Sequence, residues 1–215
     1  MIPVTRQDEP ADFNNRVRRP GRAFLRRNPP PITREIRANN LWRLCHDDLH
    51  YLYGGICAYS AQWTPRQRRP ISIEHSSVDH YIPISADHNL AYEWKNYRLA
   101  RARVNTNKGD SQNVLDPFLV QPDWFVINFR SFLIRPNDGL PAALETQIED
   151  TITQLGLNDN DFVQERINIL QAYAEDPPLG VPFTFLQQRY PFIAYELNRQ
   201  GEVDAIRERM RPQMP

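Results

Sequence analysis

Four residues between positions 78 and 110 have the types and the order of a site that acts on a phosphodiester: Asp79, His80, Asn96 and Asn105. The oxygens of Asp79 and Asn105 are hard ligands of the kind that Mg²⁺ takes, with water and substrate phosphate completing its octahedral shell. His80 carries the side chain whose ordinary pKa, about 6.5, allows it to accept a proton near neutral pH. It can therefore deprotonate a water for attack on phosphorus, while the metal stabilises the leaving oxygen.

A strand, a loop, a second strand and a short helix must bring these residues together. The stretch "ISIEHSSVDHYIPIS" supplies the first strand, "KNYRLAR" the second, and "ARVNTNKGD" a helix that Gly109 stops. Adjacent residues in a strand point to opposite faces, so Asp79 and His80 share a site only if the strand ends, twists or bulges there. Pro83 and the loop after it favour such an end.

Two more side chains have expected roles at this site. Asn96 stands where the loop joins the second strand, so we expect it to tie down the loop backbone and orient the pair 16 residues earlier. Lys108, three residues after Asn105, is expected to meet a phosphate. Each of these signals is weak alone, since an Asp-His pair is commonly structural and asparagines commonly cap helices. Their joint order and spacing carry the interpretation.

Two other pairs that contain histidine offer alternative sites. Glu74-His75 also places an acid before a histidine, but no proline follows at the matching offset, and a strand-edge pair is the simpler interpretation. His46 and His50 lie four residues apart, which is the spacing of a helical zinc pair. Their sequence, His-Asp-Asp-Leu-His, lacks the glutamate of a metalloprotease helix, so we interpret the pair as structural.

The series Asp-His-x-x-Pro, then Asn, then Asn-x-x-Lys resembles the HNH nuclease family, whose fold is two strands and a helix around one metal ion. The resemblance implies that Asp79 and Asn105 bind Mg²⁺ or Mn²⁺, that His80 is the general base, and that Asn96 stabilises the loop. Asn105 replaces the more usual histidine, as it does in the HNH domain of the CRISPR effector nucleases.

A closer resemblance covers most of the chain, through "PVTRQDEPADFNNRVRRPG", "DDLHYLYGGICAY", "LAYEWKNYRLARARVNTNKGD", "VLDPF" and "LGLND". These stretches are similar to small bacterial HNH proteins related to the nuclease subunits of retron-type and Septu-type antiphage systems. Kinship of this kind implies DNA as substrate and an ATPase subunit as partner. A nuclease with one site also needs two copies, or two encounters, to break a duplex, so a homodimer is a further expectation.

The chain departs from the wider family at a zinc site. Many relatives hold the fold with two Cys-x-x-Cys pairs, but here the first pair reads Cys57-Ala-Tyr-Ser60 and the second Arg101-Ala-Arg-Val104. Structural zinc takes four good ligands, so none is expected here. Aromatic and aliphatic packing must then hold the module, through Tyr59, Trp63, Trp94, Tyr97 and Leu99. Arg101 and Arg103, which stand in the second pair, are expected either to contact DNA or to lie on the surface. With Arg98 and Lys108 they are the residues that we assign to nucleic-acid binding.

The fold class that follows is α+β, with an HNH module of ββα-metal type flanked by other elements. Residues 1–38 are expected to form an extended basic arm, 39–56 a helix packed on the module, 57–118 the module itself, and 119–215 a hairpin and three helices. Pro29 to Pro31 forbid a helix in the arm, and "TPRQRRP" is expected to be a basic loop. Asn40 is the expected cap of the helix that Gly54 and Gly55 end.

Composition sets the remaining bounds. Residues 1–110 carry 18 basic and 11 acidic side chains, residues 111–215 carry 8 and 15, and 24 of the 26 basic residues are arginine, which suits a polyanion as partner of the first half. No apolar run approaches the ~20 residues of a membrane helix. Two cysteines make no disulfide framework, so a cytoplasmic location is expected.

Two functions from different classes fit the sequence. The first is a metal-dependent endonuclease that cuts DNA, in antiphage defence as the resemblance implies. The second is a non-catalytic nucleic-acid-binding or scaffolding subunit, which the acidic second half and the lost zinc ligands suit. RNA stays open as the target, because a metal site addresses the phosphate and not the sugar.

Overall fold

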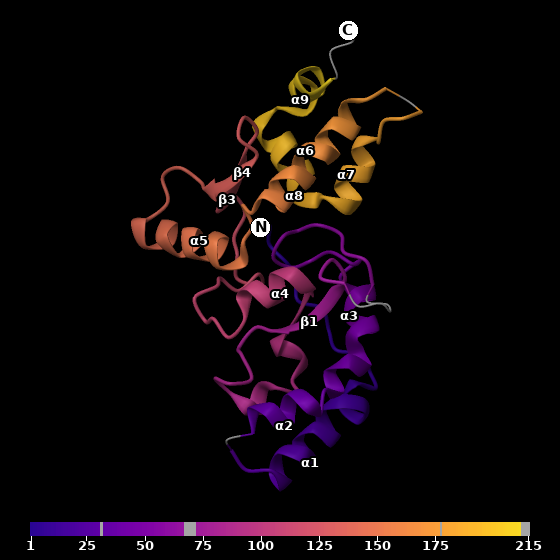
Figure 1. Ribbon diagram of the computed structural model, residues 1–215, viewed down its shortest axis with the longest axis vertical. Helices are drawn as coiled ribbons and strands as arrows, with labels where there is room; N and C mark the ends of the chain where they lie inside the picture. Colours follow the sequence, from indigo (N-terminus) through magenta and orange to yellow (C-terminus); the bar gives the residue numbers. More distant parts are fainter. Residues whose placement is uncertain (31, 67–71, 177, 212–215) are drawn as a thin grey trace.

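The computed structural model describes residues 1–30, 32–66, 72–176 and 178–211. It is a mixture of helices and two small antiparallel sheets, which confirms the α+β class. The molecule is elongated: the first half of the chain occupies one end of the long axis and the C-terminal helices occupy the other (Figure 1). Among the described segments, no helix has the length and hydropathy of a membrane span.

The N-terminal arm is helical, where an extended chain was expected. A short π-helix, η1 (Asn14–Arg18), runs into α1 (Arg19–Arg27), and α2 (Thr33–Ala38) follows. Phe13, Val17 and Gly21 recur every four residues and are buried, so one helical stripe packs on the domain. Pro20 is tolerated in the first turn of α1. Of the proline run, 29 and 30 lie outside the helices as expected, and residue 31 lies outside the described residues.

The expected helix after the arm is divided in two. A 3₁₀ segment, η2 (Leu41–Cys45), leads into α3 (His46–Leu52), and Gly54 and Gly55 end it with positive φ angles of 59° and 71°. Asn40 precedes η2 but its side chain caps nothing. The following turn holds an isolated bridge between Ile56 and Trp63. Residues 67–70, most of the expected basic loop, lie outside the described residues.

The central ββα unit forms as the sequence predicts. Strand β1 (Ser76–His80) pairs antiparallel with β2 (Tyr97–Arg101), and α4 (Ala102–Lys108) follows directly. The connecting loop carries two 3₁₀ turns, η3 (His88–Leu90) and η4 (Trp94–Asn96). Gly109, with φ of 54°, ends α4.

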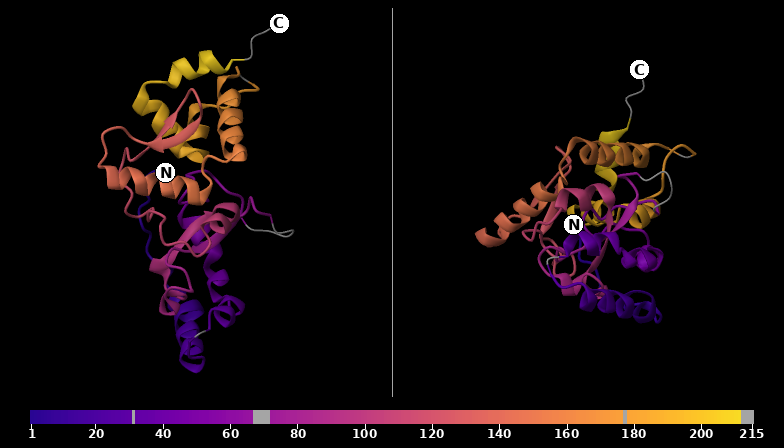
Figure 2. Two further views of the ribbon diagram at one scale, coloured as in Figure 1. Left: turned by 60° about the vertical axis from the view of Figure 1, so that its left-hand side comes forward. Right: turned by 60° about the horizontal axis from the view of Figure 1, so that its bottom comes forward.

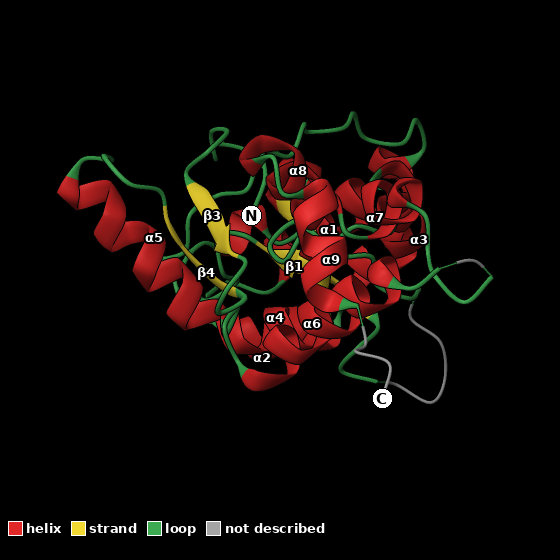
Figure 3. Ribbon diagram, turned by 90° about the horizontal axis from the view of Figure 1, so that it is seen from above, coloured by secondary structure: helices red, strands yellow, loops and turns green. Residues whose placement is uncertain are grey.

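In the described part of the second half, a hairpin is followed by five helices, where three were expected. Strands β3 (Phe125–Asn128) and β4 (Leu133–Pro136) pair antiparallel. The helices are α5 (Ala142–Leu155), α6 (Asn160–Ala174), α7 (Phe183–Arg189), α8 (Pro191–Gln200) and α9 (Val203–Met210). The closing segment breaks at Gly201, whose φ of 68° caps α8. The two views of Figure 2 show this half gathered at one end, and Figure 3 shows α5 projecting beside β3 and β4.

Two hydrophobic cores lie on either side of the β1–β2 hairpin. One joins the N-terminal helices to Tyr97 and Leu99, with Val78 packed against it, and the other joins Tyr59 and Ala100 to the C-terminal helices. Because side chains alternate along a strand, β1 presents its odd- and even-numbered residues to different cores. This division determines where each residue of the candidate site points.

Candidate active site

The ββα unit brings three of the four expected residues to one cavity of about 230 Å³. Asp79, His80 and Asn105 line it together with Trp42 from η2. Arg37 from α2 and Asp110, just beyond α4, line it as well and are half exposed, at 55 % and 50 % of their side chains. The cavity is therefore buried at its strand end and bordered by an ion pair at its surface.

Asp79 is held on both carboxylate oxygens and is only 2 % exposed. Lys108 Nζ lies 3.0 Å from Oδ1, and the Tyr59 hydroxyl donates to Oδ2 at 2.5 Å. Burial first, and the nearby carboxylate second, raise the pKa of Tyr59 well above its usual 10, so the phenol stays protonated and is the donor. The negative charge of the buried Asp79 carboxylate is thus compensated by the Lys108 ammonium, and both of its oxygens accept hydrogen bonds.

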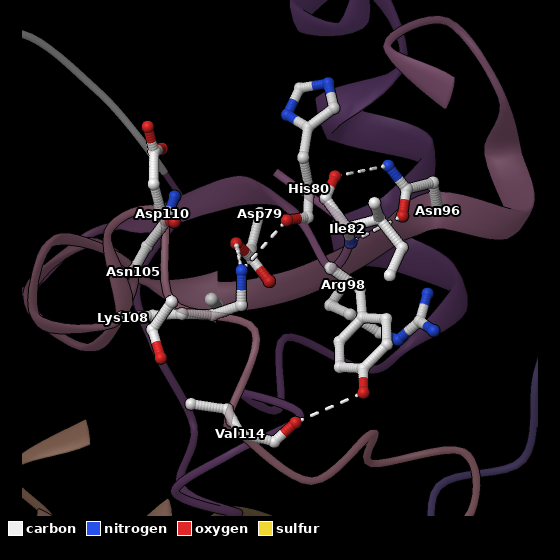
Figure 4. A network of polar contacts seen from close by, with 12 residues as sticks. Asp79, His80, Ile82, Asn96, Arg98, Asn105, Lys108, Asp110 and Val114 are labelled. Atoms are coloured by element: carbon white, nitrogen blue, oxygen red, sulfur yellow. Dashed lines mark hydrogen bonds and ion pairs between the residues drawn. The ribbon is translucent and has the colours of Figure 1, made fainter. Parts of the chain in front are cut away.

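Lys108 serves the fold of the strand end. Its ammonium group donates to Asp79 and also to the backbone carbonyl of His80 at 2.9 Å, and the residue is 1 % exposed (Figure 4). The expectation that Lys108 meets a phosphate is corrected for this conformation, because the ammonium is fully enclosed.

His80 points to the other side of β1. Its ring packs edge-on against Trp42 and Tyr97, with centroids 4.7 Å and 5.1 Å away, and Nε2 lies 2.9 Å from the carbonyl oxygen of Ala91. Since a carbonyl only accepts, Nε2 carries the proton and Nδ1 is the basic nitrogen of the neutral ring. Burial lowers the pKa of His80, so the neutral, proton-accepting form predominates at pH 7.

Asn96 makes loop contacts of the kind expected of it. Its Oδ1 accepts from the backbone N–H of Ile82 at 2.8 Å, and Nδ2 donates to the carbonyls of Ile82 at 2.9 Å and Leu90 at 3.3 Å (Figure 4). The side chain is buried and lies outside the cavity. It fixes the turn after β1 to the start of β2, and it acts on the site through the backbone.

Asn105 fastens α4 to β1. Its Nδ2 donates to Ser77 Oγ at 3.1 Å and to the carbonyl of Val78 at 3.3 Å. Both bonds use the amide nitrogen, which leaves Oδ1 as the oxygen available to a ligand in the cavity that Asn105 shares with Asp79. Figure 4 shows Asn105 and Asp110 beside Asp79, with the ring of His80 turned away.

The donor set suits a magnesium-type ion held by few protein ligands. Within the described ranges no group of three or more His, Cys, Asp or Glu side chains could hold a metal. Mg²⁺, however, is commonly bound through one or two protein oxygens with water and phosphate. Each oxygen of Asp79 accepts one hydrogen bond and retains a lone pair, and Asn105 offers Oδ1. Asp79 and Asn105 are therefore the two residues that would hold such an ion.

Two of the three arginines assigned to DNA, Arg98 and Arg101, are engaged with carboxylates inside the protein. Arg98 is 3 % exposed, pairs with Asp116 at 2.7 Å and lies over the Phe118 ring. Arg101 pairs with Glu165, 64 residues away, at 2.7 Å. Their assignment to nucleic acid is corrected for this conformation, because both guanidinium groups face the protein interior.

Arg103 and Glu74, the acid of the competing acid-histidine pair, belong to one surface network. Arg103 binds Glu74 at 3.0 Å and Asp161, and it is 25 % exposed. Glu74 is thereby a partner of arginines on β2 and α4, and it lies outside the cavity. Arg103 is thus also taken up by carboxylates, and its DNA contact is not supported by its placement.

The His46 and His50 pair makes structural contacts. His46 Nε2 lies 2.9 Å from Ser76 Oγ, and His50 Nε2 lies 3.0 Å from the Thr64 carbonyl. Burial lowers the pKa of His46 to about 4, so this ring is neutral throughout the physiological range. Both histidines join α3 to the segments around the first strand, in line with their interpretation from the sequence.

The four positions that the sequence comparison aligned with Cys-x-x-Cys pairs lie in the protein interior. Cys57, Ser60, Arg101 and Val104 are all buried, and Cys57 Sγ accepts the backbone N–H of Ser60 at 3.4 Å. Four of the five expected packing residues are buried: Tyr59, Trp94, Tyr97 and Leu99. The fifth, Trp63, is partly exposed, and the Arg189 guanidinium lies over its ring.

The sequence did not indicate four residues of this region. Arg37, Trp42 and Asp110 line the cavity, and Tyr59 binds Asp79. Tyr59 was named only for packing, and its hydroxyl contact joins residues 20 positions apart. Asp110 directly follows the Asn-x-x-Lys-Gly stretch, which is a signal that could have been used. Arg37 and Trp42 come from the N-terminal segment, and a sequence pattern gives no sign that it reaches the cavity.

Comparisons with known proteins give a distant and partial likeness. No family model matches the chain. A stretch of 110 residues, 48 % of the chain, is 26 % identical to multiphosphoryl transfer protein 1 of Escherichia coli strain K12, and the same holds for the multiphosphoryl transfer protein of Shigella flexneri. The match covers 13 % of those proteins. A likeness of this extent carries no conclusion about activity here.

Proposed function

We propose that the protein is a metal-dependent endonuclease of HNH type that hydrolyses DNA phosphodiester bonds. The observation that supports it is the shared cavity: Asp79, His80 and Asn105 line one hollow at the end of an antiparallel pair followed by a helix. That is the order of elements and residues which the family resemblance implies. The resemblance also places the nuclease in bacterial antiphage defence beside an ATPase subunit, and these parts of the proposal rest on it alone.

The roles follow from the contacts of each side chain. Asp79 and Asn105 would hold a divalent ion, and the ion would supply positive charge for the leaving oxygen. His80 accepts a proton at Nδ1, because the Ala91 carbonyl holds the proton on Nε2 and burial keeps the ring neutral. Asn96 and Lys108 position the strand end from either side of the His80 backbone, through Ile82 and through the His80 carbonyl.

The decisive experiment is plasmid cleavage with Mg²⁺ or Mn²⁺. The wild-type protein should nick or cut DNA, a chelator should stop it, and His80→Ala and Asp79→Asn should lower the rate by at least about a hundredfold. His88→Ala is the matched control, because His88 contacts Thr33 at 2.8 Å and is not among the cavity residues. Circular dichroism must show each variant folded. Cleavage that resists both the chelator and His80→Ala would refute the proposal.

A second function is favoured by one observation, the enclosure of Asp79 between Lys108 and Tyr59. A site whose acidic ligand is already neutralised suits a non-catalytic subunit that binds nucleic acid. Salt-sensitive DNA binding without cleavage, under each of Mg²⁺, Mn²⁺, Ca²⁺ and Zn²⁺, would select this alternative.

A further inference from the structure

The exposed cations of the first half are concentrated in the N-terminal helices. Within the described ranges, five exposed arginines of residues 19–43 take part in no ion pair, whereas those of β2 and α4 are paired. The five are Arg19, Arg26, Arg27, Arg34 and Arg43. The same segment supplies Trp42 and Arg37 to the cavity wall. One segment thus carries both the free positive charge and part of the candidate active site.

Arg37 is the cation nearest the reacting groups that faces solvent. Its guanidinium contacts both oxygens of Asp110, at 2.8 Å and 3.1 Å, and Asp110 also accepts from Ser85 Oγ at 2.8 Å. A half-exposed pair of this kind is weak and exchanges partners readily. A guanidinium fork that fits a carboxylate fits a phosphate with the same geometry.

We infer that Arg37 binds a backbone phosphate of the nucleic acid at the cavity, after leaving Asp110, and that the five exposed arginines continue this phosphate-binding surface. The inference rests on the proposed function for the identity of the ligand. It reassigns nucleic-acid contact from β2 and α4 to η2, α1 and α2. Asp110 then has a definite effect: its carboxylate occupies Arg37 and repels incoming phosphate, so it weakens binding.

The test measures binding apart from cleavage. Fluorescence anisotropy with a labelled 20-base-pair duplex, in chelator and at a series of salt concentrations, gives the dissociation constant and its salt dependence. Arg37→Gln should weaken binding about three- to tenfold and reduce the magnitude of the salt slope by about 0.9, the value of one phosphate contact. Arg37→Lys should keep the slope and part of the affinity, because it keeps the charge and loses the fork.

Asp110→Asn gives a change of opposite sign, which a merely structural role for the ion pair would not produce. It should tighten binding, while Arg130→Gln, an exposed arginine in the β3–β4 turn, should leave binding at the wild-type value. Equal binding by Arg37→Gln and Arg130→Gln, or weaker binding by Asp110→Asn, would overturn the inference. The inference would also fail if the wild-type protein bound no duplex. It would fail too if Arg37→Gln changed only the self-association of the protein and left duplex binding unchanged.

These outcomes are separate from those of the proposed function. If cleavage depends on His80 but Arg37→Gln binds like wild type, the nuclease proposal stands and the assignment of Arg37 fails. If no metal supports cleavage but binding changes as expected, the phosphate-binding surface stands and the catalytic proposal fails.

Discussion

Replacing Lys108 with methionine should destabilise the protein strongly, because it leaves the carboxylate of Asp79 buried without its counter-charge. Asp79 and Lys108 are 2 % and 1 % exposed, and their charged atoms lie 3.0 Å apart. Methionine keeps most of the length and volume of lysine, so packing changes little. Tyr59 remains as a hydrogen-bond donor to Asp79, but it carries no charge.

The magnitude follows from the cost of an unpaired buried charge. Removing one partner of such a pair costs about 3–5 kcal/mol, whereas replacing both is close to neutral. Lys108→Met should therefore cost about 3–5 kcal/mol in the free energy of unfolding. In the double variant Asp79→Asn with Lys108→Met, most of that loss should be recovered. The coupling energy of the cycle is then on the order of 3 kcal/mol.

Urea unfolding followed by circular dichroism measures all four proteins of the cycle. An unchanged slope against urea would show that the variants differ in stability and not in compactness. Lys108→Met should also gain more stability from added Mn²⁺ than wild type does, because a cation that binds Asp79 can replace the lost ammonium. If both single variants lose less than about 1 kcal/mol and add without coupling, the enclosed charge pair is not a stabilising feature of this fold.

Two further predictions concern neighbouring parts of the site. Burial lowers the pKa of His46 from 6.5 to about 4, so between these pH values the folded state binds fewer protons than the unfolded state. The free energy of unfolding should therefore fall by up to about 3 kcal/mol as the pH drops from about 6.5 to about 4. Asn96→Ala should cost about 1–3 kcal/mol and speed hydrogen exchange at the Ile82 amide, because it leaves the N–H and carbonyl of Ile82 unpaired.

Each has a control within the chain. His46→Gln removes the titrating ring, so its free energy of unfolding should depend less on pH than that of wild type over the same range. Identical pH dependence in the two proteins would contradict the placement of His46. Asn96→Asp keeps an acceptor for the Ile82 N–H and loses the donor, so exchange at that amide should stay slow while stability still falls. Fast exchange in Asn96→Asp and slow exchange in Asn96→Ala would contradict the role of Oδ1.

The sequence predicted the ββα unit well because its signals are local. Alternation in β1 and β2, the short helix and Gly109 each specify structure within a few residues. The spacing from Asp79 to Asn105 then placed these residues around one cavity. The sequence likewise predicted helices after the second hairpin, where α5 and α6 each bury an apolar face.

The errors arose where tertiary contacts decide the outcome. The arm was expected to be extended because of its arginines and prolines, yet Phe13, Val17 and Gly21 form a buried stripe, with Gly21 directly against the ring of Tyr92. Arg98 and Arg101 were assigned to DNA as basic residues of the second strand, with Arg101 in place of a zinc ligand. Their partners Asp116 and Glu165 lie 18 and 64 residues away. Nothing near these arginines in the sequence indicates such partners.

The adjacency of Asp79 and His80 has a physical explanation in the alternation of β1. Asp79 faces a polar enclosure, where Lys108 and Tyr59 hold its charge, and His80 faces aromatic rings, where burial keeps the imidazole neutral. In the proposed nuclease the carboxylate would have to bear charge and the base would have to lack it, so the two side chains would need opposite surroundings. Two successive positions of one strand that lies between two cores provide a polar and an aromatic environment beside a single cavity. If the two residues were further apart in the chain, either the shared cavity or the contrast between their environments would be lost.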